Sequence, residues 1–137
     1  MTKQMLIRRF VAFMIDMTVA YGGMLALWCF GPGGNMEYLM YPSVKMWLTG
    51  AYWLGYLWLY AYGIFKDCLF GRRSLGKLCM GLYIIDTQSQ AKVSYKKLIL
   101  RNITFPIVQV EGVILLILRG KRLGDMVAKT KVIDLRL

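Results

Sequence analysis

One acidic residue lies deep in the first apolar run of the sequence, where a charged side chain needs a chemical reason. Asp16 follows Arg9 by seven residues, which is two helical turns, so both side chains lie on one helix face. A carboxylate inside a membrane helix costs about 2.5–3.5 kcal/mol and must be paired, hydrated or protonated. Asp16 is therefore a candidate cation or proton site, or half of a packing clamp. Its candidate charge partners are Arg9, Arg101 and Lys77.

Two further acids are candidates for the same chemistry. Glu111 lies within a later apolar segment, 103–118, and is a second candidate acid of an ion path. Asp125 could cap a short helix beginning at Met126, or be held by neighbouring cations. Those cations are Arg119, Lys121 and Arg122. The residues alone favour a structural role for Asp125.

The sequence carries no pattern that predicts an enzyme or a cofactor. Residues 71–77 (GRRSLGK) fit the spelling of a phosphate-binding loop, but Leu78 stands where the motif needs Ser or Thr to hold magnesium. The residues before it end an apolar segment and do not form a buried strand. The chain has three cysteines and no histidine, so neither a zinc site nor a disulfide framework is expected.

The composition predicts an integral membrane protein. Of 137 residues, 58% are hydrophobic and 18% charged, whereas soluble domains are nearer 45–50% apolar and about 25% charged. The apolar residues form long runs that a small soluble core could not bury. The net charge of +11 would suit nucleic acid, but no nucleic-acid-binding motif accompanies it. We expect the charge to face anionic membrane lipid instead.

Two segments are expected to cross the membrane, residues 10–30 and 46–65. Twenty-one helical residues span about 30 Å, the thickness of the hydrocarbon core. The turn at 31–35 (GPGGN) separates the two segments. Small residues recur one turn apart in both, namely Thr18, Gly22 and Ala26 in the first and Ala51 and Gly55 in the second. Such stripes let helices approach closely, so we expect a tight antiparallel hairpin.

The basic loop 66–101 contains a short β-prone run at residues 80–86 (MGLYIID). A similar run occurs at 130–134 (TKVID), and a lone strand is unstable in water, so we expect the two to pair. Cations expected at lipid headgroups or at a partner surface lie in this loop and in the tail 119–137. They are Arg72, Arg73, Lys77, Lys96, Lys97, Arg119, Lys121 and Arg122.

The third apolar segment, 103–118, is only 16 residues long and contains Pro106. If it crossed the membrane, six cationic residues of the tail would lie outside; if it does not, 17 of the 18 lie inside. The positive-inside rule favours the second arrangement. The expected fold is thus a mainly α membrane protein in one domain, 1–137. It comprises a two-helix transmembrane hairpin, a third re-entrant or short membrane helix, and a small two-stranded cytoplasmic sheet.

Several motifs together resemble the RDD family of membrane proteins. Arg9, Ala12 and Asp16 resemble the opening of the family pattern, and residues 74–77 (SLGK) with 81–86 (GLYIID) resemble its central loop. Arg101, followed by residues 122–132 (RLGDMVAKTKV), resembles its C-terminal signature. The family is named after one arginine and two aspartates, which the resemblance assigns to Arg9, Asp16 and Asp125.

The resemblance implies a multi-pass protein of the bacterial cytoplasmic membrane with its N-terminus in the cytoplasm. It does not imply one settled activity. The first hypothesis is an oligomeric cation/proton or small-solute transport protein, with Asp16 as the site, Arg9 as its partner, and Arg101 and Asp125 at the cytoplasmic mouth. Homo-oligomers are expected because two helices and a half-segment cannot enclose a polar path. The alternative is a non-transporting accessory subunit that binds anionic lipid or a larger membrane complex.

Overall fold

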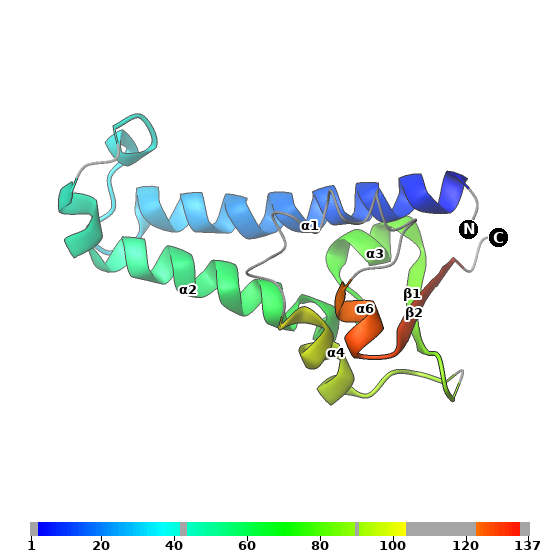
Figure 1. Cartoon of the computed structure of the whole chain (residues 1–137). Coiled ribbons are helices and arrows are strands. Elements are labelled where there is room, and N and C mark those ends of the chain that lie inside the picture. Colours follow the sequence, from blue (N-terminus) through cyan, green and yellow to red (C-terminus); the bar gives the residue numbers. More distant parts are fainter. Residues whose placement is uncertain (1–2, 42–43, 90, 104–122, 135–137) are drawn as a thin grey trace. The chain divides into compact units, whose positions relative to one another are not determined.

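The computed structural model describes residues 3–41, 44–89, 91–103 and 123–134 (Figure 1). These form two compact units, one of residues 1–16 with 64–137 and one of residues 17–63. The predicted third membrane segment lies outside the described residues from position 104 onward. So do four candidate residues of the sequence analysis, Glu111, Arg119, Lys121 and Arg122.

The first predicted span is a helix, α1, which runs from Lys3 to Phe30. Its 28 residues extend about 42 Å, more than the hydrocarbon core needs. Its mean hydropathy reaches 1.7, and only 22% of that apolar stretch is buried. The helix is therefore long and apolar enough to cross a membrane, and most of this stretch is not buried within the described part of the chain. It ends where predicted, because Gly31 and Gly34 turn the chain through hydrogen bonds to Leu27 and Gly31.

The second predicted span is shorter than expected. The helix α2 covers Gly50–Phe65, 16 residues, or about 24 Å. The expected start at Met46 is wrong, since Val44–Leu48 form a separate 3₁₀ helix, η2. The hydroxyl of Thr49 donates to the Met46 carbonyl at 2.7 Å, which closes that turn before α2 begins. A membrane crossing by α2 stays a prediction. A further 3₁₀ helix, η1 (Met36–Leu39), precedes η2.

Within the unit 17–63, α1 and α2 pack through glycines, but only one predicted stripe is involved. Ala51 and Gly55 are buried, and a Cβ at Gly55 would lie 2.4 Å from Nε1 of Trp28. On α1 the close approach is at Gly23, where a Cβ would lie 2.1 Å from Nε1 of Trp58. The predicted α1 stripe is wrong, since its members Thr18, Gly22 and Ala26 are exposed. The two indole rings explain this, because each needs the space beside a glycine on the facing helix.

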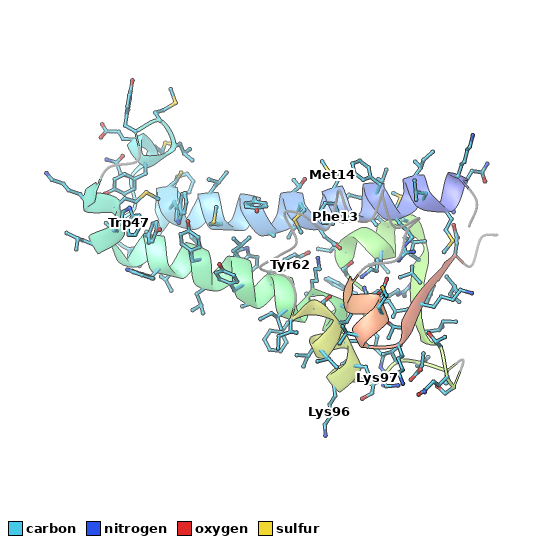
Figure 2. All side chains as sticks on the ribbon, viewed as in Figure 1. Phe13, Met14, Trp47, Tyr62, Lys96 and Lys97 are labelled. Atoms are coloured by element: carbon cyan, nitrogen blue, oxygen red, sulfur yellow. The ribbon has the colours of Figure 1, made fainter. Side chains whose placement is uncertain are left out.

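Aromatic rings fill much of this hairpin (Figure 2). Trp28 of α1 stacks on Tyr52 of α2 with ring centroids 5.7 Å apart. Tyr52 also contacts Trp47 at 5.4 Å and Tyr56 at 4.8 Å. Stacked and edge-on ring pairs each add about 0.5–1.5 kcal/mol beyond buried area. The Tyr52–Trp28 pair thus joins α2 to α1 within this unit.

The other unit joins the first part of α1 to a small α/β module. Its further elements are η3 (Lys66–Cys68), α3 (Leu75–Met80), β1 (Leu82–Asp86), α4 (Tyr95–Asn102), α6 (Leu123–Val127) and β2 (Thr130–Asp134). The predicted strand pairing is confirmed, since β1 and β2 are antiparallel with Ile84 opposite Val132. The first strand begins at Leu82 and not at Met80, because Gly81, with φ 68°, ends α3.

The core of this unit lies between α1 and the sheet. Alternate residues of β1 are buried, and the core cluster comprises Ala12, Leu82, Ile84, Val93, Leu98 and Val132. Ala12 is the contribution of α1. The helix that is apolar enough for a membrane is thereby packed, at its N-terminal part, against the module that carries most of the charged residues.

Candidate functional site

Asp16 is almost fully buried and is held by the start of α3. Its side chain is 1% exposed, and the hydroxyl of Ser74 donates to one carboxylate oxygen at 2.6 Å. The backbone N–H of Gly76 donates to the other oxygen at 2.8 Å. Ser74 is also the N-cap of α3, so the carboxylate lies where the helix dipole favours negative charge. The expectation that Asp16 pairs with Arg9, Arg101 or Lys77 is therefore wrong.

The close approach of α3 to α1 depends on Gly76. A Cβ at this position would lie 1.9 Å from the carbonyl oxygen of Ala12 and 2.7 Å from its carbonyl carbon. These are backbone atoms and cannot move aside by rotation. Only glycine lets the N–H of residue 76 reach the Asp16 carboxylate.

Arg9 forms an ion pair with Asp125, the second of the two aspartates that the resemblance singled out. Its guanidinium donates to Oδ2 of Asp125 at 3.0 Å, and both side chains are buried. Arg101 lies 3.1 Å from Oδ1 of the same carboxylate, and the Thr130 hydroxyl donates to that oxygen at 3.4 Å. Asp125 lies inside α6 (Leu123–Val127), so its predicted role as a cap before Met126 is wrong.

Asp67, which the sequence did not single out, joins two more cations. It is 0% exposed, and its Oδ2 accepts from Arg101 at 2.9 Å. Its Oδ1 accepts from the ammonium of Lys77. Lys77 is only 4% exposed, so its predicted place at the lipid or partner surface is wrong. The physical reason is that α3 directs Lys77 inward, and the carboxylate of Asp67 neutralises its charge there.

The charge state of Asp67 follows from its neighbours. Burial alone would raise the pKa of its carboxyl, because water no longer solvates the charge. The cations of Lys77, Arg101 and Lys66 outweigh burial and hold the pKa of Asp67 well below its ordinary value. Asp67 is thus ionised at neutral pH, and its negative charge offsets part of the positive charge of these buried cations.

These contacts form one continuous chain of buried charges, which we call the charge lock. It runs from Arg9 through Asp125, Arg101 and Asp67 to Lys77. The lock contains two aspartates, Asp67 and Asp125, and Asp16 lies beside it as a third. Each of the six carboxylate oxygens of these three aspartates accepts a hydrogen bond from a donor in the chain. Removing one partner of a buried pair costs about 3–5 kcal/mol, so the lock fixes the relative positions of α1, η3, α3, α4 and α6.

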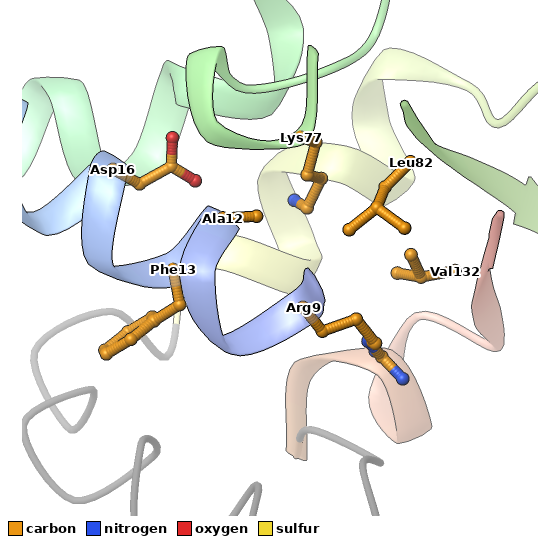
Figure 3. Close-up of a pocket in the computed structure, with 7 residues that line it drawn as sticks. All are labelled: Arg9, Ala12, Phe13, Asp16, Lys77, Leu82 and Val132. Carbon is orange, nitrogen blue, oxygen red and sulfur yellow. The ribbon is translucent and has the colours of Figure 1, made fainter. Parts of the chain in front are cut away.

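A small cavity adjoins the charge lock on the α1 side (Figure 3). It is lined by Arg9, Asp16 and Lys77 together with Ala12, Phe13, Leu82 and Val132. The cavity volume open to the centre of a water molecule is about 10 Å³. This is close to the minimum volume that holds one buried water. Three of the seven lining residues carry a charged side chain.

Three of the remaining predicted surface cations, Arg72, Arg73 and Lys97, are only partly exposed. The guanidinium of Arg72 lies 4.8 Å from the ring centre of Tyr95, and that of Arg73 lies 4.0 Å from the ring of Tyr83. Lys97 pairs with Asp86. Hydrogen bonds from the Lys97 ammonium and the Gln88 N–H lower the pKa of the Asp86 carboxyl. Lys96 is exposed and points away from α4 (Figure 2).

Sequence reasoning missed Asp67 and Ser74 for different reasons. Asp67 directly follows Lys66 at the end of an apolar segment, which is typical of a solvated helix end. Ser74 did carry a signal, since a serine immediately before a helix predicts an N-cap. No pattern indicated that its hydroxyl would also bind an aspartate 58 residues earlier.

The long apolar helix α1 is of the kind that crosses a membrane in helical membrane proteins. Residues 4–129 match the model of the RDD family, and the chain belongs to that family. It matches no curated protein and no solved structure.

Proposed function

We propose that the chain is a non-transporting accessory protein of the membrane, which binds anionic lipid or a partner membrane complex through its basic face. One observation carries the proposal. All carboxylate oxygens of Asp16, Asp67 and Asp125 accept hydrogen bonds from donors of the chain itself. A cation or a travelling proton at these acids would have to displace a guanidinium, an ammonium, a hydroxyl or a backbone N–H.

The charge balance supports the same proposal. The buried cations Arg9, Lys77 and Arg101 lie around Asp67 and Asp125, so the potential at these carboxylates is already compensated. Lys66 adds a fourth buried cation. A site for a transported cation needs uncompensated negative charge or free oxygen ligands. The buried charges of this cluster favour a structural lock over a cation site.

The exposed surface offers contacts suited to a membrane partner. Gly22 and Ala26 lie exposed on the apolar face of α1. Small residues one turn apart let a helix of another protein approach closely. Lys92 and Lys96, which are exposed near and on α4, add cations for an anionic surface.

A second candidate function is cation/proton or small-solute transport by a homo-oligomer. The small cavity beside Arg9, Asp16 and Lys77 favours it, because a water there could connect Asp16 with the charge lock. In this arrangement Asp16 would exchange a proton with that water, and neighbouring subunits would complete the path.

Proteoliposome flux measurements separate the two functions. The wild type and Asp16→Asn are reconstituted, and internal pH is followed under imposed sodium, potassium or lithium gradients. The accessory proposal expects the same proton leak as in protein-free vesicles for both proteins, while an added potassium–proton ionophore gives a full response. Asn retains the size of Asp and an oxygen to accept from Gly76, so the variant tests charge with little change in shape.

Cation-dependent proton movement in the wild type would overturn the accessory proposal. It would assign transport to Asp16 if Asp16→Asn abolished the movement while helix content and elution volume in size-exclusion chromatography stayed unchanged.

A further inference from the structure

Residues 69–73, which we call the arginine turn, present apolar and cationic side chains together. Leu69 and Phe70 are 50% and 47% exposed, and Phe65 at the end of α2 is 49% exposed. Arg72 and Arg73 follow directly. Large apolar side chains beside arginines, without other cover in the described part of the chain, are typical of surfaces that enter the boundary between lipid headgroups and acyl chains.

Both ends of the arginine turn are anchored. Before it, Asp67 is fixed in the charge lock. After it, Ser74 donates to Asp16 of α1 at 2.6 Å. Asp16 lies only six residues beyond Phe10, where the apolar stretch of α1 begins, which is about 9 Å along the helix. The turn is thus held beside the helix that is apolar enough to cross a membrane, near the end of its apolar stretch.

The two arginines are set for anion recognition. Each guanidinium lies over a tyrosine ring, at 4.8 Å for Arg72 on Tyr95 and 4.0 Å for Arg73 on Tyr83. A guanidinium over a ring keeps N–H donors in its plane, and that planar fork suits two oxygens of a phosphate group. Arg72 also has φ 66°, in the left-handed region that residues other than glycine seldom adopt.

We propose that the arginine turn is a binding site for anionic phospholipid. Arg72 and Arg73 bind the headgroup phosphate, and Leu69 and Phe70 insert among the acyl chains beside it. This site rests on the proposed function and gives its lipid-binding face a specific location. The positive charge of the turn and the hydrogen bond from Ser74 to Asp16 of the apolar helix favour a lipid surface. A soluble phosphate compound would leave the exposed apolar residues uncovered.

The test measures lipid binding by the full-length chain in detergent. Phosphatidylglycerol is titrated, bound lipid is counted by native mass spectrometry, and phosphatidylcholine serves as the neutral lipid. Arg72→Gln/Arg73→Gln is compared with Lys92→Gln/Lys96→Gln, which removes the same charge from exposed positions outside the turn. An arginine near an anionic surface is worth about a fivefold change in affinity, so the arginine variant should bind phosphatidylglycerol on the order of thirtyfold more weakly. Lys92 and Lys96 contribute only to the general attraction of the basic face, so the lysine variant should lose clearly less affinity than the arginine variant.

A second variant, Leu69→Ser/Phe70→Ser, keeps the arginines and tests the apolar part. It should weaken binding of phosphatidylglycerol but not of inorganic phosphate, which is measured as a competitor. Circular dichroism of every variant establishes that the fold is retained.

Three outcomes would overturn the site. Equal losses in the arginine and lysine variants would show general attraction by the basic face, and the proposed function would then stand without this site. Competition by inorganic phosphate at millimolar concentration, with no effect of the serine variant, would assign a soluble anion. A wild type that does not prefer phosphatidylglycerol over phosphatidylcholine would contradict the site and leave only a protein partner for the proposed function.

Discussion

Asp67→Ala is expected to lower the free energy of unfolding by about 3–5 kcal/mol, because a buried ion pair loses one partner. The substitution leaves Lys77 and Arg101, which are 4% and 3% exposed, without their shared carboxylate. Neither cation can reach water without moving α3 or α4. The measurement is thermal unfolding in detergent followed by far-ultraviolet circular dichroism. Tryptophan fluorescence would not serve, since Trp28, Trp47, Trp53 and Trp58 all lie in the other unit.

Asp86→Ala is the matched control for Asp67→Ala. It also removes an aspartate that accepts from a lysine, but Lys97 is 36% exposed and can return to water. The control should therefore lose clearly less stability. A rescue adds to the test, because Asp67→Ala with Lys77→Met removes one of the stranded charges and should recover part of the loss. Equal losses for Asp67→Ala and Asp86→Ala would contradict the assignment of Asp67 as the centre of the lock.

The stability of Asp67→Asn as a function of pH tests whether the ionised Asp67 carboxylate stabilises the fold. The pKa of Asp67 is lower in the folded chain than the value of about 3.9 in an unfolded one. Its contribution to stability is therefore complete above about pH 4 and is lost as the pH falls further. The wild type should lose stability below about pH 4 more steeply than Asp67→Asn, which has no carboxyl there to protonate.

Gly76→Ala is expected to separate α3 from α1. The added Cβ would lie 1.9 Å from the Ala12 carbonyl oxygen, so the backbone must move. Overpacking of this kind costs about 1–3 kcal/mol or more. The movement also breaks the hydrogen bond from Gly76 to Asp16, and leaving buried groups unsatisfied costs about 1–3 kcal/mol. Hydrogen–deuterium exchange of the α3 and β1 amides should accelerate at least tenfold.

Gly22→Ala is the control for Gly76→Ala. It makes the same chemical change, but in α1 and not in α3. A Cβ at Gly22 would meet no atom within 4 Å. Alanine also has the higher helix propensity, so this variant should be as stable as the wild type or slightly more stable. Wild-type exchange rates in Gly76→Ala would show that α1 and α3 are not in backbone contact.

Local features of the fold were predictable, because the residues that determine them are near in sequence. The GPGGN turn fixed the end of α1, and two β-prone runs at 80–86 and 130–134 predicted the sheet. The small-residue stripe of α1 was predicted to contact α2 and does not, because residue size cannot show which face a neighbouring indole will occupy. The start of α2 was misplaced for a related reason, since the turn closed by Thr49 interrupts a run that is apolar throughout.

Most members of the site were predictable, but Asp67, Ser74 and the pairs that these residues form were not. An acid in an apolar helix must be satisfied, so the burial of Asp16 followed from its position. Its partners Ser74 and Gly76 lie 58 and 60 residues away, and no periodic pattern connects them. Arg9 and Asp16 share a helix face, which suggested a pair, but α6 brings Asp125 to Arg9 instead. Long-range packing, which spacing does not encode, decides which charges meet.

A double-mutant cycle on Arg9 and Asp125 tests the charge lock most directly. Arg9→Met, Asp125→Leu and the double variant are compared with the wild type by the free energy of unfolding in detergent. The lock predicts that the two substitutions are strongly coupled, with the double variant more stable by about 2–3 kcal/mol than the sum of the single losses implies. Losses that add to within about 0.5 kcal/mol would contradict it, because the two side chains would then contribute to stability independently.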